Sequence, residues 1–342
     1  MKADVSFTFT NCGQSGKNGP SGTQITAAYV GTALEGQVST GWKAGYQRWI
    51  VPTTGLCWIE AKGARGGNSA KNGGGGTTVR GKFTLTAGQV LNVVVGQIGK
   101  DISGSYGASG GGGSFVVTDT NSTPLIVAGG GGGAGGTMDS IRFATGENGA
   151  DTADTIGGKN GYGGQGGRSG GGGGFLGNGN SYYSGQGGLS FQSGLTGGTP
   201  TSNGDSGGFG GGGATHVNFW KQGGGGGGYS GGAAPRGDKG IFSEEGAGGG
   251  SFNAGTDTLL QVNANNGHGR VIIWSAQPAV TPLTNTNFQT AVNLWFTNEA
   301  NATATYGPIK DWNTSAVTNM QNAFFHRATF DENISGWDVS NV

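Results

Sequence analysis

Apolar and polar residues alternate along much of the chain, in short runs bounded by turn residues. The first run is SFTFT at residues 6–10, and later runs are rich in Val, Ile, Phe and Trp. Such alternation over roughly four to eight residues is typical of a β-strand with one buried face. It predicts strands over the following residues: 6–10, 46–51, 56–59, 77–85, 90–95, 114–118, 125–127, 258–262 and 268–274. No stretch before about residue 285 combines helical periodicity with adequate length, so this part is expected to be all β.

Two of these runs predict a β-hairpin. Residues 46–51 and 56–59 flank the turn sequence Pro52-Thr53-Thr54-Gly55. A Pro/Gly turn between two runs of aromatic and β-branched residues favours antiparallel pairing of those runs. We therefore expect the two strands to be hydrogen-bonded to each other.

Glycine fills the space between the runs and recurs at every third position. The rows are Gly13, Gly16, Gly19 and Gly22; Gly104, Gly107, Gly110 and Gly113; Gly158, Gly161, Gly164, Gly167, Gly170 and Gly173; Gly204, Gly207, Gly210 and Gly213; and Gly225, Gly228, Gly231, Ala234, Gly237 and Gly240. Three residues per turn is the period of the extended polyproline-type helix, which has no internal hydrogen bonds. Glycine at the contact edge lets neighbouring backbones bond to one another. The rows predict polyglycine-II helices packed side by side as a bundle inserted between the strands.

Two other structures share this composition. Collagen needs an unbroken Gly-X-Y register and abundant Pro, whereas this chain has only 8 Pro. A flexible Gly/Ser linker has no reason to keep a period of three, and it seldom separates strands that must pair, as we expect around Val95 and Val271. Ordering glycine costs about 0.5–1 kcal/mol per residue beyond alanine. Hydrogen bonds between helices, at about 0.5–1.5 kcal/mol each, are the large offset available, and an ordered bundle is favoured.

Charge is sparse and balanced, with 19 basic and 19 acidic residues among 342 and 81 glycines. Without clustered Lys and Arg, no nucleic-acid partner is expected, and one Arg65-Gly66-Gly67 triplet is expected by chance in so glycine-rich a chain. No run approaches the roughly 18 apolar residues of a membrane span, so no membrane insertion is expected in this segment. Residues 1–7 lack the apolar core of a signal peptide.

The two cysteines, Cys12 and Cys57, are not in a metal-ligand or Cys-x-x-Cys spacing. Two states remain open for them. They form one disulfide if the chain matures in an oxidising place, or they stay as two unpaired, half-buried thiols.

The strand and glycine segments resemble the extracellular glycine-rich domain of the anaplastic lymphoma kinase and leukocyte tyrosine kinase receptors. The resemblance covers nearly the whole of residues 5–274. It is carried by Phe7-Thr8-Phe9-Thr10-Asn11-Cys12-Gly13, Trp49-Ile50-Val51-Pro52, Gly63-Ala64-Arg65-Gly66-Gly67, Val95-Gly96-Gln97-Ile98-Gly99, Pro124-Leu125-Ile126-Val127-Ala128 and Gly267-His268-Gly269-Arg270-Val271. It implies an antiparallel β-sandwich similar to tumour-necrosis-factor folds, with hexagonally packed glycine helices between strands. The chain lacks most of the receptors' cysteines, their membrane span and the kinase, so receptor signalling is not implied.

The pattern changes after residue 275. Trp312-Asn313-Thr314-Ser315-Ala316-Val317 recurs in part as Trp337-Asp338-Val339-Ser340-Asn341-Val342, an offset of 25 residues from 312 to 337. The repeat resembles the BspA-like leucine-rich surface repeat, a solenoid module, and 288–296 resembles its helical leader, with Phe288, Val292 and Trp295 on one face. We expect a glycine-rich domain at 1–275, a linker at 276–286 and the start of a repeat region at 287–342 that continues in a longer protein.

Catalytic chemistry has no support in the sequence. His216, His268 and His326 lie far apart, and no phosphate loop or Ser/His/Asp set is found. We therefore expect no enzyme activity, no cofactor and no metal.

The candidate partner contacts are residues that interrupt the glycine rows. Tyr182 and Tyr183, and Phe219 and Trp220, suit a protein or glycan contact, or else close the ends of helices. Arg236-Gly237-Asp238 spells an integrin-type attachment triplet that frequent glycine also produces by chance.

These features favour a non-enzymatic structural or adhesive module on a cell, fibre or virion surface, extracellular in location. Its partners would be a protein or glycan on another surface, or copies of itself in a larger assembly. The alternatives are a ligand-binding receptor ectodomain and, last, an ice-binding protein.

Overall fold

The computed structural model describes residues 6–119, 123–181, 186–200, 204–215, 221–237, 243–275 and 281–342. The chain divides into two compact units, Val5–Ser275 and Ala276–Val342. Each unit is described by itself.

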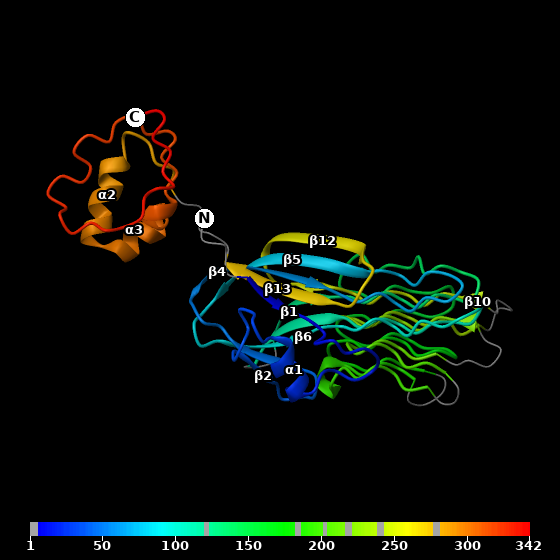
Figure 1. Cartoon of the computed structure of the whole chain (residues 1–342). Coiled ribbons are helices and arrows are strands. Elements are labelled where there is room, and N and C mark those ends of the chain that lie inside the picture. Colours follow the sequence, from blue (N-terminus) through cyan, green and yellow to red (C-terminus); the bar gives the residue numbers. More distant parts are fainter. Residues whose placement is uncertain are drawn as a thin grey trace. The chain divides into compact units, whose positions relative to one another are not determined.

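In the described part of the first unit, two antiparallel sheets carry most of the regular structure (Figure 1). Sheet I has the strand order β1 (Ser6–Phe9), β13 (Arg270–Ser275), β4 (Gly55–Lys62), β5 (Gly76–Leu85) and β12 (Thr256–Asn265). Sheet II has the order β11 (Phe252–Asn253), β8 (Pro124–Ala128), β7 (Ser114–Thr118), β6 (Val90–Val94), β3 (Gln47–Ile50) and β2 (Val38–Thr40). The short strands β9 (Lys221–Gln222) and β10 (Ser243–Glu244) pair in parallel.

Both sheets contribute to one hydrophobic core. Alternate residues of sheet I, such as Ile59 and Val271, are fully buried in the same cluster as Trp49 and Val116 of sheet II. Aromatic contact joins the sheets, because the rings of Phe9 and Trp49 meet edge to face at 5.8 Å. The prediction of a mainly β unit with antiparallel strands is confirmed.

The predicted hairpin is wrong. β3 pairs with β2 and β6, whereas β4 pairs with β5 and β13, so the turn at 52–54 carries the chain from one sheet to the other. Trp49 and Ile59 then point into the core from opposite sides. The expected pairing around Val95 and Val271 is also wrong, because β6 and β13 belong to different sheets, although both residues lie in the shared core.

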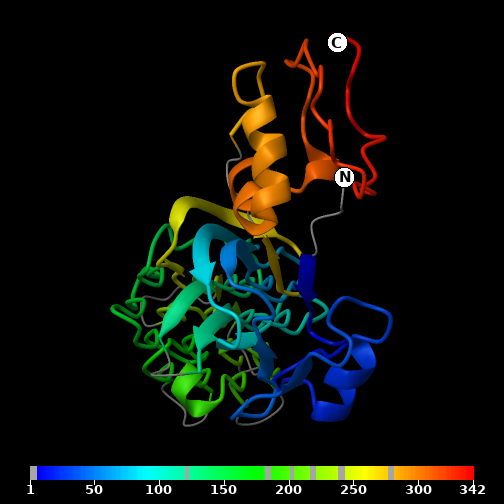
Figure 2. The same ribbon diagram turned by 90° about the vertical axis from the view of Figure 1, so that its left-hand side faces the viewer.

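A short helix, α1 (Gly22–Ala28), begins at the last glycine of the first predicted row. The Ser21 side chain caps it by accepting from the Gln24 N–H, and the Gln24 side-chain oxygen accepts from the Ser21 N–H at 2.8 Å. Gly13 and Gly16 have left-handed φ angles of 71° and 102°, so that row is a pair of turns before a helix. Figure 2 shows α1, in dark blue, at the side of the unit. The expectation of no helix before residue 285 is therefore wrong.

The glycine segments between strands run side by side beyond one end of the sheets (Figure 1). The segment at 223–228 is fully buried, and each of its N–H groups donates to another segment. Donors three residues apart reach the same neighbour: Gly223 and Gly226 donate to Glu244 and Ala247, Gly224 and Gly227 to Ala108 and Gly111, and Gly225 and Gly228 to Gly170 and Gly173, at 2.8–3.1 Å. Its carbonyl oxygens accept from three further places, at Gly130 and Gly133, Gly213 and Gly232, at 2.7–2.8 Å.

The predicted rows are not continuous along their length. Gly104, Gly161, Gly210 and Gly237 have left-handed φ angles of 82°, 86°, 103° and 74°. In the longest row the chain folds back, since the N–H of Gly164 donates to the carbonyl of Gly172 at 2.9 Å. Spacing alone could not reveal these breaks, because a glycine at a turn keeps the count of three while changing direction.

The second unit has its own core. It contains α2 (Phe288–Thr297), α3 (Glu299–Tyr306) and a 3₁₀ turn at Ile309–Asp311. Phe288 and Val292 of α2 are buried with Trp312 and Trp337, and the partly buried Trp295 packs against them, as predicted. α3 was not predicted, because its largely polar sequence has almost no apolar periodicity.

The two repeat copies lie side by side. The rings of Trp312 and Trp337 stack at 5.8 Å with an 11° angle between planes. Asn313 and Asp338 each accept from the N–H two residues later, at 3.1 and 3.0 Å. Each copy therefore forms the same kind of turn. The Thr314 hydroxyl of the first copy donates to the carbonyl oxygen of Asp338 in the second, at 2.9 Å.

Gly226→Ala tests the close approach of backbones in the glycine segments. A Cβ at Gly226 would lie 2.2 Å from the carbonyl oxygen of Gly130, so the substitution displaces a neighbouring segment. Overpacking of this kind costs about 1–3 kcal/mol, which lowers the Tm of a unit of this size by roughly 2–12 °C. Differential scanning calorimetry measures the effect.

Gly146→Ala is the matched control. A Cβ there meets nothing within 4 Å and the φ angle is not left-handed, so Tm is expected to stay unchanged or rise slightly. Equal Tm values for the two variants would contradict the packing.

Candidate functional site

The sequence-predicted contacts are only partly placed. Tyr182, Tyr183, Phe219, Trp220 and Asp238 lie outside the described residues.

Of the attachment triplet, Arg236 is exposed and Gly237 is buried with a φ of 74°. The carboxylate of Asp154 accepts from both backbone N–H groups, at 3.0 and 2.9 Å. This turn is therefore fastened at its backbone, and an attachment role for the triplet stays a prediction.

Cys12 and Cys57 are free thiols in the structure, the first buried and the second half-buried. Burial raises the pKa of both, although hydrogen bonds of Cys12 with Tyr29 and Thr10 oppose the rise at Cys12. Raised pKa values keep the thiols protonated and weakly nucleophilic. Cys12 instead joins a buried network, in which its Sγ contacts the Tyr29 hydroxyl at 3.8 Å.

A polar cleft of about 680 Å³ lies where three segments meet. Residues 65–73 follow β4, residues 139–143 follow β8, and residues 263–266 span the end of β12 and the turn into β13. Asparagines from two of these segments, one Arg and one Asp line it together with Ile141 and Phe143. The sequence analysis did not predict this cleft.

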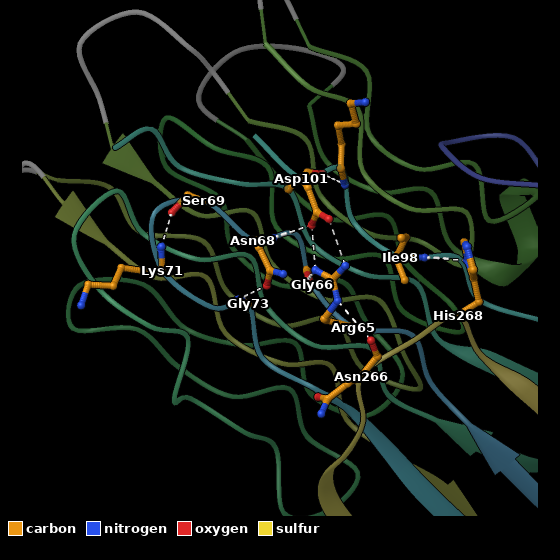
Figure 3. Close-up of polar contacts among 12 residues, drawn as sticks. Arg65, Gly66, Asn68, Ser69, Lys71, Gly73, Ile98, Asp101, Asn266 and His268 are labelled. Atoms are coloured by element: carbon orange, nitrogen blue, oxygen red, sulfur yellow. Dashed lines mark hydrogen bonds and ion pairs between the residues drawn. The ribbon is translucent and has the colours of Figure 1, made fainter. Parts of the chain in front are cut away.

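Arg65 fastens two sides of the cleft (Figure 3). Its Nη1 and Nη2 donate to the two carboxylate oxygens of Asp101 at 2.7 and 3.1 Å, and its Nε donates to the carbonyl of Asn266 at 3.2 Å. Burial alone would raise the pKa of Asp101, but the hydrogen bonds from Arg65 and the Asn68 N–H outweigh it and lower that pKa. Asp101 is therefore ionised, and its negative charge neutralises much of the positive charge of Arg65.

Side-chain oxygens hold the cleft's backbone in place. Asn68 Oδ1 accepts from the Gly73 N–H at 2.9 Å, and Asn263 Oδ1 accepts from the Gly75 N–H at 2.7 Å. Asp139 Oδ1 accepts from the Asn72 N–H at 2.7 Å. Asn263 also has a left-handed φ of 52°, at an irregularity of the pairing between β12 and β5. These bonds fix the polar side chains that border the cleft.

His268 is attached to the same region (Figure 3). Its Nδ1 accepts from the Ile98 N–H at 3.2 Å, which requires a ring nitrogen without a proton. Burial, and then the positive charge of Arg65, lower the pKa of His268 below 6.5. The imidazole is therefore a neutral structural acceptor at neutral pH.

The polar groups of the cleft are arranged for hydrogen bonding. Among the described residues, no group of three His, Cys, Asp or Glu side chains is placed to hold a metal ion. Every helix that the structure describes is too short or too polar to span a bilayer.

Sequence reasoning treated Arg65-Gly66-Gly67 as a chance match and His268 as an isolated histidine. The usable signal was the set of Asn and Asp residues beside glycine segments, at residues 68, 72 and 139, and around the end of β12, at residues 263 and 266. Their convergence depends on the packing of three segments distant in sequence.

Parts of the chain are similar to known proteins. The model of a family described as "Mycoplasma protein of unknown function, DUF285" matches residues 284–342. The chain is also 38% identical over 99 residues to the leukocyte tyrosine kinase receptor of Mus musculus, which covers 28% of this chain and 11% of the receptor. The matched part is thus about a tenth of that receptor's length. The resemblance to leucine-rich surface repeats stays a prediction.

His268→Asn tests the acceptor role. Because the folded state binds a proton on His268 less readily than the unfolded chain, stability is lost as pH falls below about 6.5, and the loss grows toward the lowered folded pKa. Asparagine keeps an acceptor oxygen and does not titrate. The Tm of the His268→Asn variant should therefore fall less between pH 7.5 and pH 5 than that of the wild type. An NMR titration giving His268 a pKa at or above 6.5 would contradict this role.

Proposed function

We propose that this chain is a non-enzymatic structural and adhesive module, displayed extracellularly on a cell, fibre or virion surface. In this proposal its rigid part is a bundle of polyglycine-II helices inserted in a sandwich of the tumour-necrosis-factor type. The observation that carries the proposal is the bonding of segment 223–228. Donors three residues apart reach one neighbour, which matches about three residues per turn.

Several features support a stiff module. Segment 223–228 is bonded to its neighbours backbone to backbone, and its Gly224 and Gly227, which carry no side chain, are fully buried. The second unit adds paired turns from the repeated sequence, which suit a stacked, leucine-rich-type solenoid. The receptor similarity over 99 residues supports a location outside the cell.

Amide hydrogen exchange tests the rigid bundle. We expect Gly224 and Gly227 to exchange as slowly as Ile59 in β4, because opening them requires the bundle to separate. Exchange at random-coil rates across 223–228, with Ile59 still protected, would overturn the scaffold proposal.

Surface display is tested separately. Antibodies raised against the purified chain should label intact, unpermeabilised cells or particles of the source. Labelling only after permeabilisation would overturn the display proposal and leave the bundle untouched.

A ligand-binding receptor ectodomain is the second candidate, favoured by the 38% identity to a receptor. The two candidates differ in their partners. A structural module should form multimers or bind an extended surface, whereas an ectodomain should stay monomeric and form a defined complex with one soluble protein. Light scattering of native material distinguishes them.

A further inference from the structure

We propose that the cleft beside Arg65 binds a neutral saccharide. The proposal deepens the adhesive function and rests on it for its biological setting. It replaces an unspecified surface partner by one ligand class and one set of residues.

The polar groups of the cleft suit hydroxyls. Within the described residues, Asn68 Nδ2, Asn263 Nδ2 and Asp139 Oδ2 have no hydrogen-bond partner. The other polar atom of each side chain accepts from a backbone N–H group. The side chains of Asn72 and Asn266 are exposed at the same cleft. A sugar hydroxyl both donates and accepts, so amide N–H groups beside a carboxylate oxygen satisfy it in both directions.

The charges of the cleft favour a neutral ligand. Its cation, Arg65, is bound in a bidentate manner by Asp101 at 2.7 and 3.1 Å, so little positive charge remains for an anion. The other charged lining residue, Asp139, repels anions. Among the lining residues no cation is left without an anion beside it, so a phosphate or an acidic sugar would gain no ion pair there.

Two apolar side chains complete the site. Phe143 is half-buried and Ile141 is 70% exposed. Such surfaces match the C–H faces of a pyranose ring, which polar groups cannot satisfy. The volume of about 680 Å³ suits one or two sugar rings.

The walls are held before any ligand arrives. The Asn72 carbonyl accepts from the Ser140 N–H at 2.8 Å, and Ser140 Oγ donates to the carbonyl of Gly246 at 2.9 Å. Together with the hydrogen bonds of Arg65, these contacts attach residues 65–73 and 139–143 to the packed glycine segments. A preorganised site loses less entropy on binding, which matters for a weak ligand such as a sugar.

Saturation-transfer NMR and titration calorimetry test the proposal. The purified full chain is titrated with methyl glycosides and disaccharides of glucose, galactose, mannose and N-acetylglucosamine, with sialyllactose and inorganic phosphate as the anionic arms. We expect at least one neutral sugar to bind and to bind more tightly than either anion.

Asn72→Ala and Phe143→Ala should each weaken that binding by about tenfold, as expected for one lost ligand contact of about 1.4 kcal/mol. Asn180→Ala, an exposed asparagine outside the cleft lining, is the control and should bind as the wild type does. Unchanged Tm values exclude loss of fold.

Three outcomes would overturn the proposal: no neutral sugar binds, an anion binds more tightly, or neither cleft variant changes the affinity. None of these outcomes alters the slow exchange expected at 223–228 or the surface labelling expected for the module. Failure of the saccharide site is therefore distinguishable from failure of the surface module.

Discussion

The structure depends on hydrogen bonds between the buried backbone groups of neighbouring glycine segments. A buried N–H or C=O without a partner is costly, so each such group must find one. In the bundle, partners lie so close that a neighbouring carbonyl occupies the place of a Cβ. A Cβ at Gly131 would lie 1.7 Å from the Gly74 oxygen, and one at Gly112 would lie 1.7 Å from the Phe209 oxygen. Glycine is required there by space, and the hydrogen bonds offset its entropy.

The sheets give the bundle its register. Gly63 follows the end of β4, and Gly129 follows the end of β8. The Gly63 N–H donates to the carbonyl of Thr77 in β5, and the Thr77 N–H donates to the carbonyl of Gly129, both at 2.9 Å. The first glycines of each segment are thus aligned by strands that a hydrophobic core already holds. A glycine chain without such anchors would gain too little from its first contacts to become ordered.

The sequence was most informative where one residue's surroundings are local. Short runs of aromatic and β-branched residues located β1, β5 and β7, although only the second half of β5 buries every second side chain. It could not show that β3 and β4 lie in different sheets, since a crossing and a hairpin need the same turn residues. The helix α1 escaped because 7 residues are too few to show a period, although its Ser21 and Gln24 capping pair was readable. The cleft escaped because its segments meet only after the bundle forms.

The same constraint decides where chemistry can be located. Many glycine positions between the packed segments leave no space for a Cβ, so the longer polar side chains of the cleft lie where a glycine segment turns or meets a strand. Arg65 occupies such a place, since only Gly63 and Ala64 separate it from the end of β4, while its guanidinium reaches Asp101 and the turn before β13. Asn68 and Asp139 lie at further ends of segments, where the backbone leaves the block. Side chains at these ends reach back to bond the backbone, as Asn68 does to the Gly73 N–H, and still leave polar atoms at the surface. The place of the cleft, at the margin of the packed glycine segments, follows from that division between positions without space for a Cβ and segment ends that have it.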